Sequence, residues 1–250
     1  MPELTELKTW LWVDYDEIGS TNDEALRLSK DLLPNQKIVI TAQKQSKGRG
    51  RRGRSWISLD GNLFMSMLFS WPLEDCGAIT FMVSLALLNT VLKLSPQASV
   101  GLKWPNDVLL NNHKLSGILL ERGEKNSLVI GIGVNIKNAP SGNNMLYPAT
   151  SLKAQGVACD RITFLKQYLQ EFDNICEKYK QEGLSSIVEL WKQKAVGLGQ
   201  KIIVRTPKME EKGIFANINH DGMLQLKMND GTIKTISAGD VFFDDNGDNN

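Results

Sequence analysis

The sequence predicts an α+β fold in which a large domain of strands and helices precedes a small β-barrel. Up to about residue 196, segments with the apolar pattern of strands are interspersed with segments of helical pattern. From Leu198 onward, five or so short strand-like segments follow one another, and Asp221-Gly222 and Asp230-Gly231 are typical of hairpin turns. We expect a first domain over 1–196, an SH3-like β-barrel over 197–245 and a disordered tail over 246–250.

The first elements of the chain are a strand, a helix and a second strand. Residues 10–19 (WLWVDYDEIG) have the residue types of a strand. Residues 20–33 (STNDEALRLSKDLL) predict a helix that starts with a capping box, in which Thr21 is the N-cap and Glu24 follows three residues later. Residues 37–43 (KIVITAQ) predict the second strand.

The middle of the chain continues this mixture of strands and helices. Residues 61–71 (GNLFMSMLFSW) alternate well enough for a strand, whereas residues 78–94 are apolar around most of a helical circumference and predict a buried helix. Two short strands around a turn at Asn111-Asn112-His113 are expected within residues 100–121, and an apolar strand over 127–136. The remaining segments are a loop over 138–151 and amphipathic helices over about 161–181 and 184–195.

Composition argues against several classes of function. The net charge is only +1, which disfavours bulk binding to nucleic acid. Two histidines and three well-separated cysteines make a zinc site unexpected, and the cysteines fit reduced thiols of a cytoplasmic protein. The N-terminus lacks a secretory pattern, and no apolar run is long enough to cross a bilayer. We therefore expect a cytoplasmic protein with no membrane partner.

Residues 48–56, GRGRRGRSW, place four arginines and three glycines in seven consecutive positions. No strand or helix periodicity can be drawn through them, so a loop is expected. Arginine suits phosphate oxygens, and glycine lets a loop change shape and approach a ligand closely. Neither a Walker A loop nor GxGxxG occurs in the chain. Three interpretations stay open from the residues alone: a phosphate clamp, a solvated loop, or RNA binding.

Two further stretches carry polar groups in positions suited to a ligand. KWPND (103–107) combines a cation, an aromatic plate and two polar residues at a turn, although a strand–turn–strand corner explains it equally well. Lys114 enters the apolar strand that contains Gly117, either to meet an anion or to extend into solvent. Ser20-Thr21-Asn22 begins a helix, where caps and anionic ligand groups both occur.

GRGRRGRSW, KWPNDVLL followed by KLSGILLE, and GIGVNI, in this order after an STN helix start, resemble the biotin protein ligases. The resemblance runs from about residue 12 to about residue 245. It implies a mixed-sheet catalytic domain followed by an SH3-like domain. It also implies a two-step reaction, in which biotin and ATP give biotinyl-5′-AMP and pyrophosphate, and a lysine of a biotin carboxyl carrier protein then takes the biotinyl group. ATP with Mg²⁺ and biotin are the implied ligands.

The resemblance also implies roles for individual residues. Lys114, Arg51 and Arg54 would be catalytic, with both arginines at the α-phosphate and adenylate. Trp56, Asn106 and Asn135 would complete the ATP and adenylate site, and Asp107 would help to hold Mg²⁺. The biotin site would consist of Ser20, Thr21, Asn22, Gln45, Gly48, Arg49, Lys114 and Gly117. The cations would offset repulsion between a carboxylate and a polyphosphate, and closure of the loop would protect the adenylate from water.

The chain departs from the family pattern in three places. Lys47 precedes the arginine loop where a small residue is usual, and the stretch after the loop lacks a common proline. The STN helix starts at residue 20, which leaves no room for the DNA-binding domain of some relatives, so we expect no DNA partner. Monomer and homodimer both stay open. The competing hypotheses are a lipoate ligase or octanoyl transferase, and an RNA-binding module.

Overall fold

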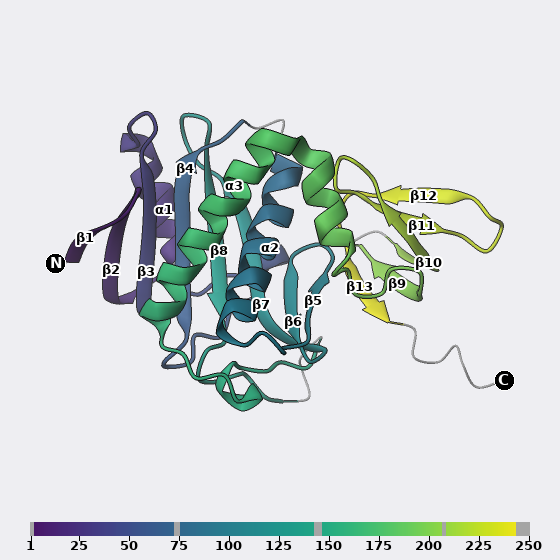
Figure 1. Cartoon of the computed structure of the whole chain (residues 1–250), viewed down its shortest axis with the longest axis horizontal. Helices are drawn as coiled ribbons and strands as arrows, with labels where there is room; N and C mark the ends of the chain where they lie inside the picture. The colour runs from purple at the N-terminus through teal and green to yellow at the C-terminus, as the bar shows by residue number, and fades with distance from the viewer. Residues whose placement is uncertain (1–2, 73–75, 143–146, 207–208, 244–250) are drawn as a thin grey trace.

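The computed structural model describes residues 3–72, 76–142, 147–206 and 209–243, and Figure 1 shows its two sheets side by side. The tail expected over 246–250 lies outside the described residues. The strands of the large sheet are, in spatial order, β1 (Glu3–Leu7), β2 (Trp10–Ile18), β3 (Lys37–Gln45), β4 (Leu63–Ser70), β8 (Ser127–Val134), β7 (His113–Arg122), β6 (Asp107–Leu110) and β5 (Val100–Lys103). Strands β2 and β3 are parallel and the other neighbours antiparallel, so the expected mixed sheet is confirmed.

Successive residues of the central strands pack on opposite faces of this sheet. Val39 on β3 and Met65 on β4 belong to the main core, which also contains the helices α2 and α3, whereas Ile38 and Ile40 face the core under α1. The helices are α1 (Thr21–Leu28), α2 (Cys76–Leu94) and α3 (Arg161–Lys192). Complete burial of one such side chain stabilises the folded state by about 1.5–3 kcal/mol. Packing of helices on both faces of the sheet is therefore favoured.

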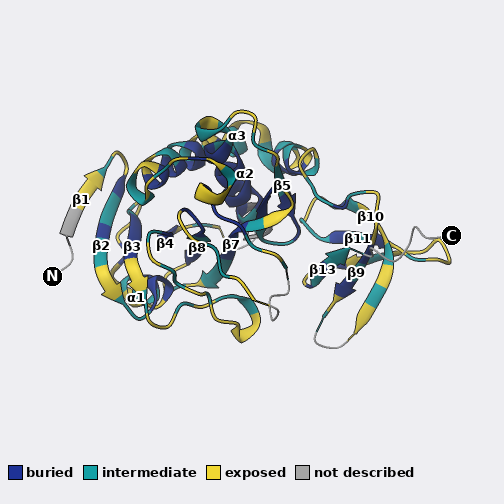
Figure 2. Ribbon diagram, turned by 90° about the horizontal axis from the view of Figure 1, so that it is seen from below, coloured by how far each residue is buried: buried dark blue, intermediate teal, exposed yellow. Residues whose placement is uncertain are grey.

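Helix α2 is the buried helix that the apolar run predicts. Its residues from Ile79 to Val91 are almost all buried, because the large sheet lies on one side and α3 on the other (Figure 2). Gly183, with φ of 77°, interrupts α3 between the two predicted amphipathic helices. Both helices are thus confirmed as halves of one broken element. None of the helices in the described residues combines the length and apolar character of a membrane span.

The predicted capping box at the start of α1 is wrong. Ser20, not Thr21, is the N-cap, and its side chain makes no capping hydrogen bond. The Thr21 hydroxyl instead bonds to Gln45 Oε1 at 3.1 Å, and the Glu24 carboxylate accepts a bond from the Tyr15 hydroxyl. The side chains that a local cap would need therefore bond to residues distant in the sequence. Helix α1 also ends at Leu28, five residues before the predicted end at 33.

Two further differences concern short strands. Residues 100–121 form three strands and not two, because the turn at residues 104–106 separates β5 from β6. The predicted turn before β7 is confirmed, with φ of 49° at Asn111 and 61° at Asn112. Strand β1, which the sequence does not predict, pairs antiparallel with β2 at the sheet edge.

The small sheet follows α3 and is fully antiparallel. Its spatial order is β12 (Ile233–Ile236), β11 (Leu224–Lys227), β10 (Glu210–Ile218), β9 (Lys201–Arg205) and β13 (Asp240–Phe243). Gly222 and Gly231 have φ of 79° and 84° in the two predicted hairpin turns, which are confirmed. A separate small sheet after a mixed sheet is the α+β fold that the sequence predicts.

Candidate active site

A cavity of about 410 Å³ lies between the start of α1, the arginine-rich loop, the strands β6 to β8, and β13 of the small sheet. We call residues 48–56 the flap. Of the predicted site residues, all but Gly48 line this cavity: Ser20, Thr21, Asn22, Gln45, Arg49, Arg51, Arg54, Trp56, Asn106, Asp107, Lys114, Gly117 and Asn135. Motifs that are far apart in the sequence therefore meet in one place.

The flap folds back on itself, which explains the position of Gly48. Backbone bonds join Gly50 N to Arg54 O at 2.7 Å and Trp56 N to Gly48 O at 2.9 Å. A Cβ on Gly48 would lie 2.6 Å from Trp56 O, so glycine is required where the two ends of the flap approach each other. Gly48 thus shapes the flap and does not line the cavity.

Trp56 rests on a pair of glycines in the sheet. Gly117 and Gly133 are directly opposite on β7 and β8, and a Cβ on them would lie 3.0 and 2.3 Å from atoms of the Trp56 ring. At Gly133 no other residue type would leave room for the indole, and at Gly117 a side chain would make a tight contact with it. The Trp56 Nε1 is buried without a hydrogen-bond partner in the described residues, so it is a donor available to a ligand.

One end of the cavity is polar and neutral. Gln45 Oε1 accepts from the Thr21 amide at 2.9 Å, and its amide nitrogen lies 3.3 Å from Ser58 Oγ. The Ser66 hydroxyl contacts both Thr21 Oγ1 and Asn22 Oδ1. These groups fix hydroxyl and amide side chains in known orientations, as recognition of a polar ring requires.

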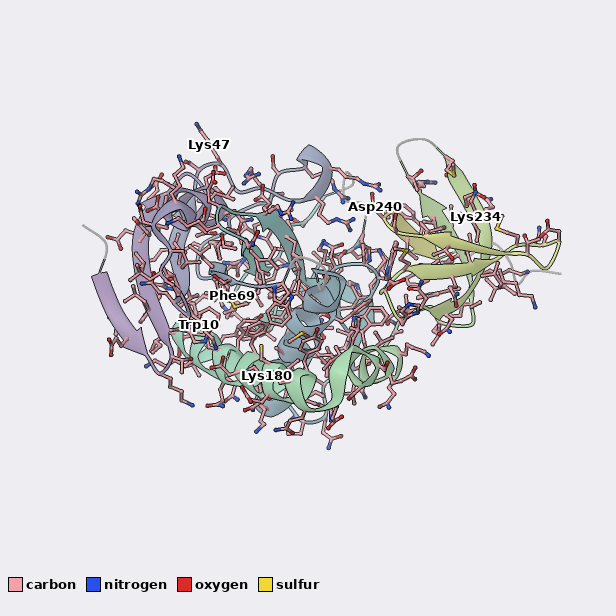
Figure 3. The ribbon with its side chains drawn as sticks, turned by 90° about the horizontal axis from the view of Figure 1, so that it is seen from above. Trp10, Lys47, Phe69, Lys180, Lys234 and Asp240 are labelled. Carbon is pink, nitrogen blue, oxygen red and sulfur yellow. The ribbon has the colours of Figure 1, made fainter. Side chains whose placement is uncertain are left out.

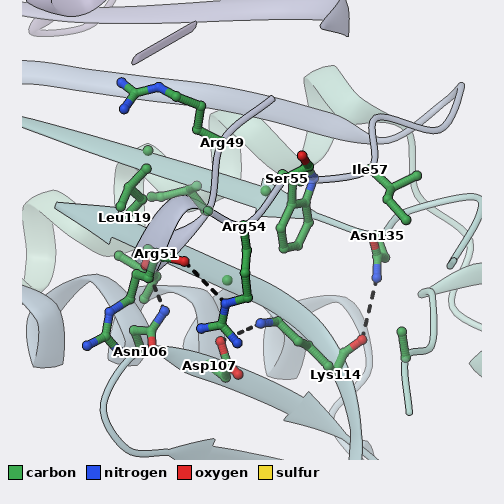
Figure 4. Close-up of a pocket in the computed structure, with 18 of the residues that line it drawn as sticks. Arg49, Arg51, Arg54, Ser55, Ile57, Asn106, Asp107, Lys114, Leu119 and Asn135 are labelled. Carbon is green, nitrogen blue, oxygen red and sulfur yellow. Dashed lines mark hydrogen bonds and ion pairs between the residues drawn. The ribbon is translucent and has the colours of Figure 1, made fainter. Parts of the chain in front are cut away.

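The opposite part of the cavity collects cations (Figure 4). Lys114 Nζ lies 2.7 Å from Asp107 Oδ1, and Arg51 donates to Asn106 Oδ1 at 2.7 Å. Burial lowers the pKa of the Arg51 guanidinium, whereas the carboxylates of Asp240 and Asp107 raise it. Asn135 Nδ2 lies 3.5 Å from the Lys114 carbonyl. The arrangement can hold an anion beside Lys114.

Arg49 points away from this cluster in Figure 4. Its guanidinium donates to both oxygens of Glu121 at 2.7 and 2.8 Å, and pairs with Asp23 at 2.8 Å. Glu121 also accepts from Asn22 Nδ2 at 2.7 Å, so it ties the flap to the start of α1. Glu121 was not predicted from the sequence, although it shares a face of β7 with Gly117, four residues earlier.

Asp240 of the small sheet is a second site residue that was not predicted from the sequence. It pairs with Arg52 at 2.9 Å and with Arg54 at 3.0 Å, so it fastens the flap to the small sheet. Figure 3 shows Asp240 between the large domain and the small sheet. No local signal marks it, because it lies 186 positions beyond Arg54. Lys103, the cation of the KWPND stretch, also lines the cavity, and so do Gly131, Gly133, Tyr147 and Phe242, which the sequence did not single out.

Replacement of Asp240 by asparagine is expected to loosen the flap without unfolding the protein. Each such ion pair contributes about 0.2–1 kcal/mol, so losing two should raise flap opening by about two- to thirtyfold. Tryptic cleavage at the flap arginines measures the opening. Asp221→Asn is the control, because this 54% exposed carboxylate lies in the turn between β10 and β11. Unchanged cleavage of Asp240→Asn would show that the pairs do not hold the flap.

The mixed sheet, the appended small sheet and the cation-lined cavity between them define the class of biotin/lipoate protein ligases. Residues 16–136 match the Biotin/lipoate A/B protein ligase family, and residues 197–244 match the Biotin protein ligase C terminal domain. Within that class, the chain belongs to the biotin protein ligases.

Individual relatives are similar over almost the whole chain. The biotin–[acetyl-CoA-carboxylase] ligase of Paracoccus denitrificans is 36% identical over 236 residues, which cover 90% of this chain and 97% of that protein. The bifunctional ligase/repressor BirA of Bacillus subtilis is 32% identical, with 94% of this chain and 74% of that protein covered. The structure of the Aquifex aeolicus biotin protein ligase with biotin and ATP superposes with a TM-score of 0.79 at 26% identity, over 94% of this chain and 98% of that one.

Proposed function

We propose that this chain is an ATP-dependent ligase that activates biotin as biotinyl-5′-AMP and transfers it to a lysine of the biotin carboxyl carrier protein of acetyl-CoA carboxylase. The observation that carries the proposal is the convergence of Lys114, Arg51 and Arg54 on one cavity that is neutral and polar at its other end. Such a cavity can hold a neutral ring with its carboxylate against the cations. The names of the relatives supply the acid and the carrier.

In the first step, the biotin carboxylate attacks the α-phosphorus of ATP and pyrophosphate leaves. Both reactants are anions, so their approach requires positive charge placed in advance. We assign this role to Lys114, which reaches the carboxylate and the α-phosphate, and to Arg51 and Arg54 on the flap. Arg54 is held by Asp240 and Arg51 by Asn106, so neither guanidinium must reorganise during the reaction.

In the second step, the carrier lysine attacks the acyl carbon of the mixed anhydride and AMP leaves. The anhydride must be kept from water until the carrier arrives. We assign this protection to the flap and to Trp56, whose indole covers the sheet at Gly117 and Gly133. The biotin ring is assigned to Ser20, Thr21, Asn22 and Gln45, with Arg49 and Gly48 shaping the entrance, and the adenine to Asn106 and Asn135.

Mg²⁺ fits the site as a companion of the nucleotide. It is usually held by one or two carboxylates together with substrate phosphates. Asp107 and Asp240 both line the cavity, and the described residues contain no cluster of three metal-ligating side chains. Asp107 would hold the ion, which would neutralise charge on the phosphates.

Pyrophosphate exchange with biotin or lipoate as the acid, followed by mass spectrometry of a purified carrier domain, tests the proposed function. We expect exchange with biotin, and one added biotinyl group only when ATP and the acceptor lysine are both present. A carrier with that lysine replaced by arginine is the control. Exchange with lipoate alone, or none with biotin, would contradict the proposal.

The absence of DNA binding and the choice between monomer and homodimer stay predictions. The net charge of +1 supports weak attraction to nucleic acid. An electrophoretic shift of biotin-operon DNA by nanomolar protein would contradict the predicted absence of DNA binding. Sedimentation with and without biotin and ATP distinguishes the monomer from the homodimer.

A further inference from the structure

Lys103 is a buried cation that the reaction as described above does not use. It is the last residue of β5, its exposed fraction is 7%, and it lines the cavity. Within the described ranges its ammonium makes no hydrogen bond and no ion pair with a carboxylate. Its neighbours are aromatic: Nζ lies 4.3 Å from the ring centre of Tyr147 and 5.9 Å from that of Phe242.

An ammonium in this position is costly unless an anion joins it. Ring faces offset part of the lost hydration of a cation, but they supply no acceptor for its three protons. Burial lowers the pKa of Lys103, whereas the carboxylates of Asp107 and Asp240, each beyond ion-pair distance, raise it. A lysine with only a packing role would extend its head to bulk solvent, whereas this one faces the cavity.

The sheet register shows where this cation lies relative to the rest of the site. Lys103 is opposite Asp107, Asp107 is opposite Gly117, and Gly117 is opposite Gly133. Directly opposed residues share a face of the sheet, and neighbouring strands are about 4.8 Å apart, so the row spans about 14 Å. All four line the cavity, with Trp56 over the two glycines and Lys103 at the far end, next to the small sheet.

This order assigns the parts of the nucleotide to places along the row. Lys114 pairs with Asp107, so the joining of the carboxylate and the α-phosphate falls in the middle of the row. The leaving group departs on the side away from the attacking carboxylate, which is the side of Lys103.

We propose that Lys103 binds the β- and γ-phosphates of ATP and stabilises the departing pyrophosphate; this proposal rests on the function proposed above. As the bond between the α-phosphorus and its bridging oxygen breaks, the electron pair remains on that oxygen, and the pyrophosphate gains negative charge. The Lys103 ammonium donates hydrogen bonds to it, and no proton needs to be transferred. The second step involves no pyrophosphate, so it does not depend on Lys103.

The two half-reactions separate this role from a structural one. Lys103→Met is expected to lower kcat/KM for ATP in biotinyl-AMP formation by about 10²–10³-fold. Transfer from synthetic biotinyl-5′-AMP to the carrier, and biotin binding measured by calorimetry without ATP, should stay within about twofold of wild type. Lys103→Arg, which keeps the charge, should recover much of the first step. Lys44→Met, at an exposed ion pair on β3, is the matched control.

The outcomes distinguish this proposal from the proposed function. Wild-type protein that makes no biotinyl-AMP contradicts the proposed function itself. If wild type is active, formation of biotinyl-AMP at the normal rate by Lys103→Met overturns the proposed role of Lys103. An equal loss of biotinyl-AMP formation and of transfer to the carrier also overturns it. Loss of biotin binding alone would assign the ammonium to the biotin carboxylate and overturn it as well. If Lys103→Met fails to fold, Lys103→Gln gives the same comparison.

Discussion

Lys114→Met is expected to lower the rate of biotinyl-AMP formation by about 10²–10³-fold, the usual effect of removing one well-placed donor from a developing charge. The ammonium lies 2.7 Å from Asp107 and is the cation nearest the middle of the cavity row. Without it, the carboxylate and the α-phosphate meet beside an unpaired Asp107, which adds repulsion. Biotin-dependent pyrophosphate exchange measures the effect.

The fold should tolerate this change. The Lys114 side chain is 27% exposed and pairs with the 16% exposed Asp107, so the variant should fold with a lowered melting temperature. Lys180→Met is the control, because Lys180 is 67% exposed on α3 and lies far from Asp240 and from Lys47, which precedes the flap, in Figure 3. Exchange at the wild-type rate in a folded Lys114→Met protein would remove Lys114 from the mechanism.

Gly133→Ala is expected to displace Trp56 and to shorten the retention of biotinyl-AMP. The added methyl would lie 2.3 Å from the indole, so the ring must move away from the sheet. Overpacking of this kind costs about 1–3 kcal/mol, which corresponds to about five- to a hundredfold faster loss of the adenylate. Release of radiolabelled biotinyl-AMP from the purified complex measures it.

Two matched variants make this prediction specific. Gly117→Ala should have a smaller effect, because its nearest indole atom would be 3.0 Å away. Trp56→Ala removes the ring, so adding Gly133→Ala to it should change retention little further. If Gly117→Ala and Gly133→Ala had equal effects, and the same effects in wild type and in Trp56→Ala, the packing of Trp56 on Gly133 would be contradicted.

The sequence predicts best those features that local chemistry determines. The hairpin glycines Gly222 and Gly231 and the turn at Asn111-Asn112 adopt left-handed conformations that few other residues favour. Helix α2 is apolar around most of its circumference, so it had to be buried wherever it packed. The flap and the KWPND turn indicate a site when they are taken together, because each stretch alone also has a structural interpretation.

Features that depend on distant partners escaped sequence reasoning. Thr21 has the residue type of a cap, but its tertiary contact with Gln45, 24 positions later, determines its role. Asp240 and Phe242 reach the cavity only because the small sheet docks beside β5 and the flap. Strand β1 carries charged residues and gains its structure by pairing with β2, so its own sequence has no strong strand pattern.

The cavity is enclosed jointly by the two sheets, and this has a consequence for protein engineering. Chimaeras that join residues 1–196 of this chain to the terminal portion of a distant relative would replace the aromatic ring beside Lys103 and the carboxylate that anchors Arg52 and Arg54. A crossover at this boundary would therefore change side chains that line the cavity, in addition to exchanging the small sheet. Active chimaeras should be those in which Asp240, Phe242 and the flap come from the same parent.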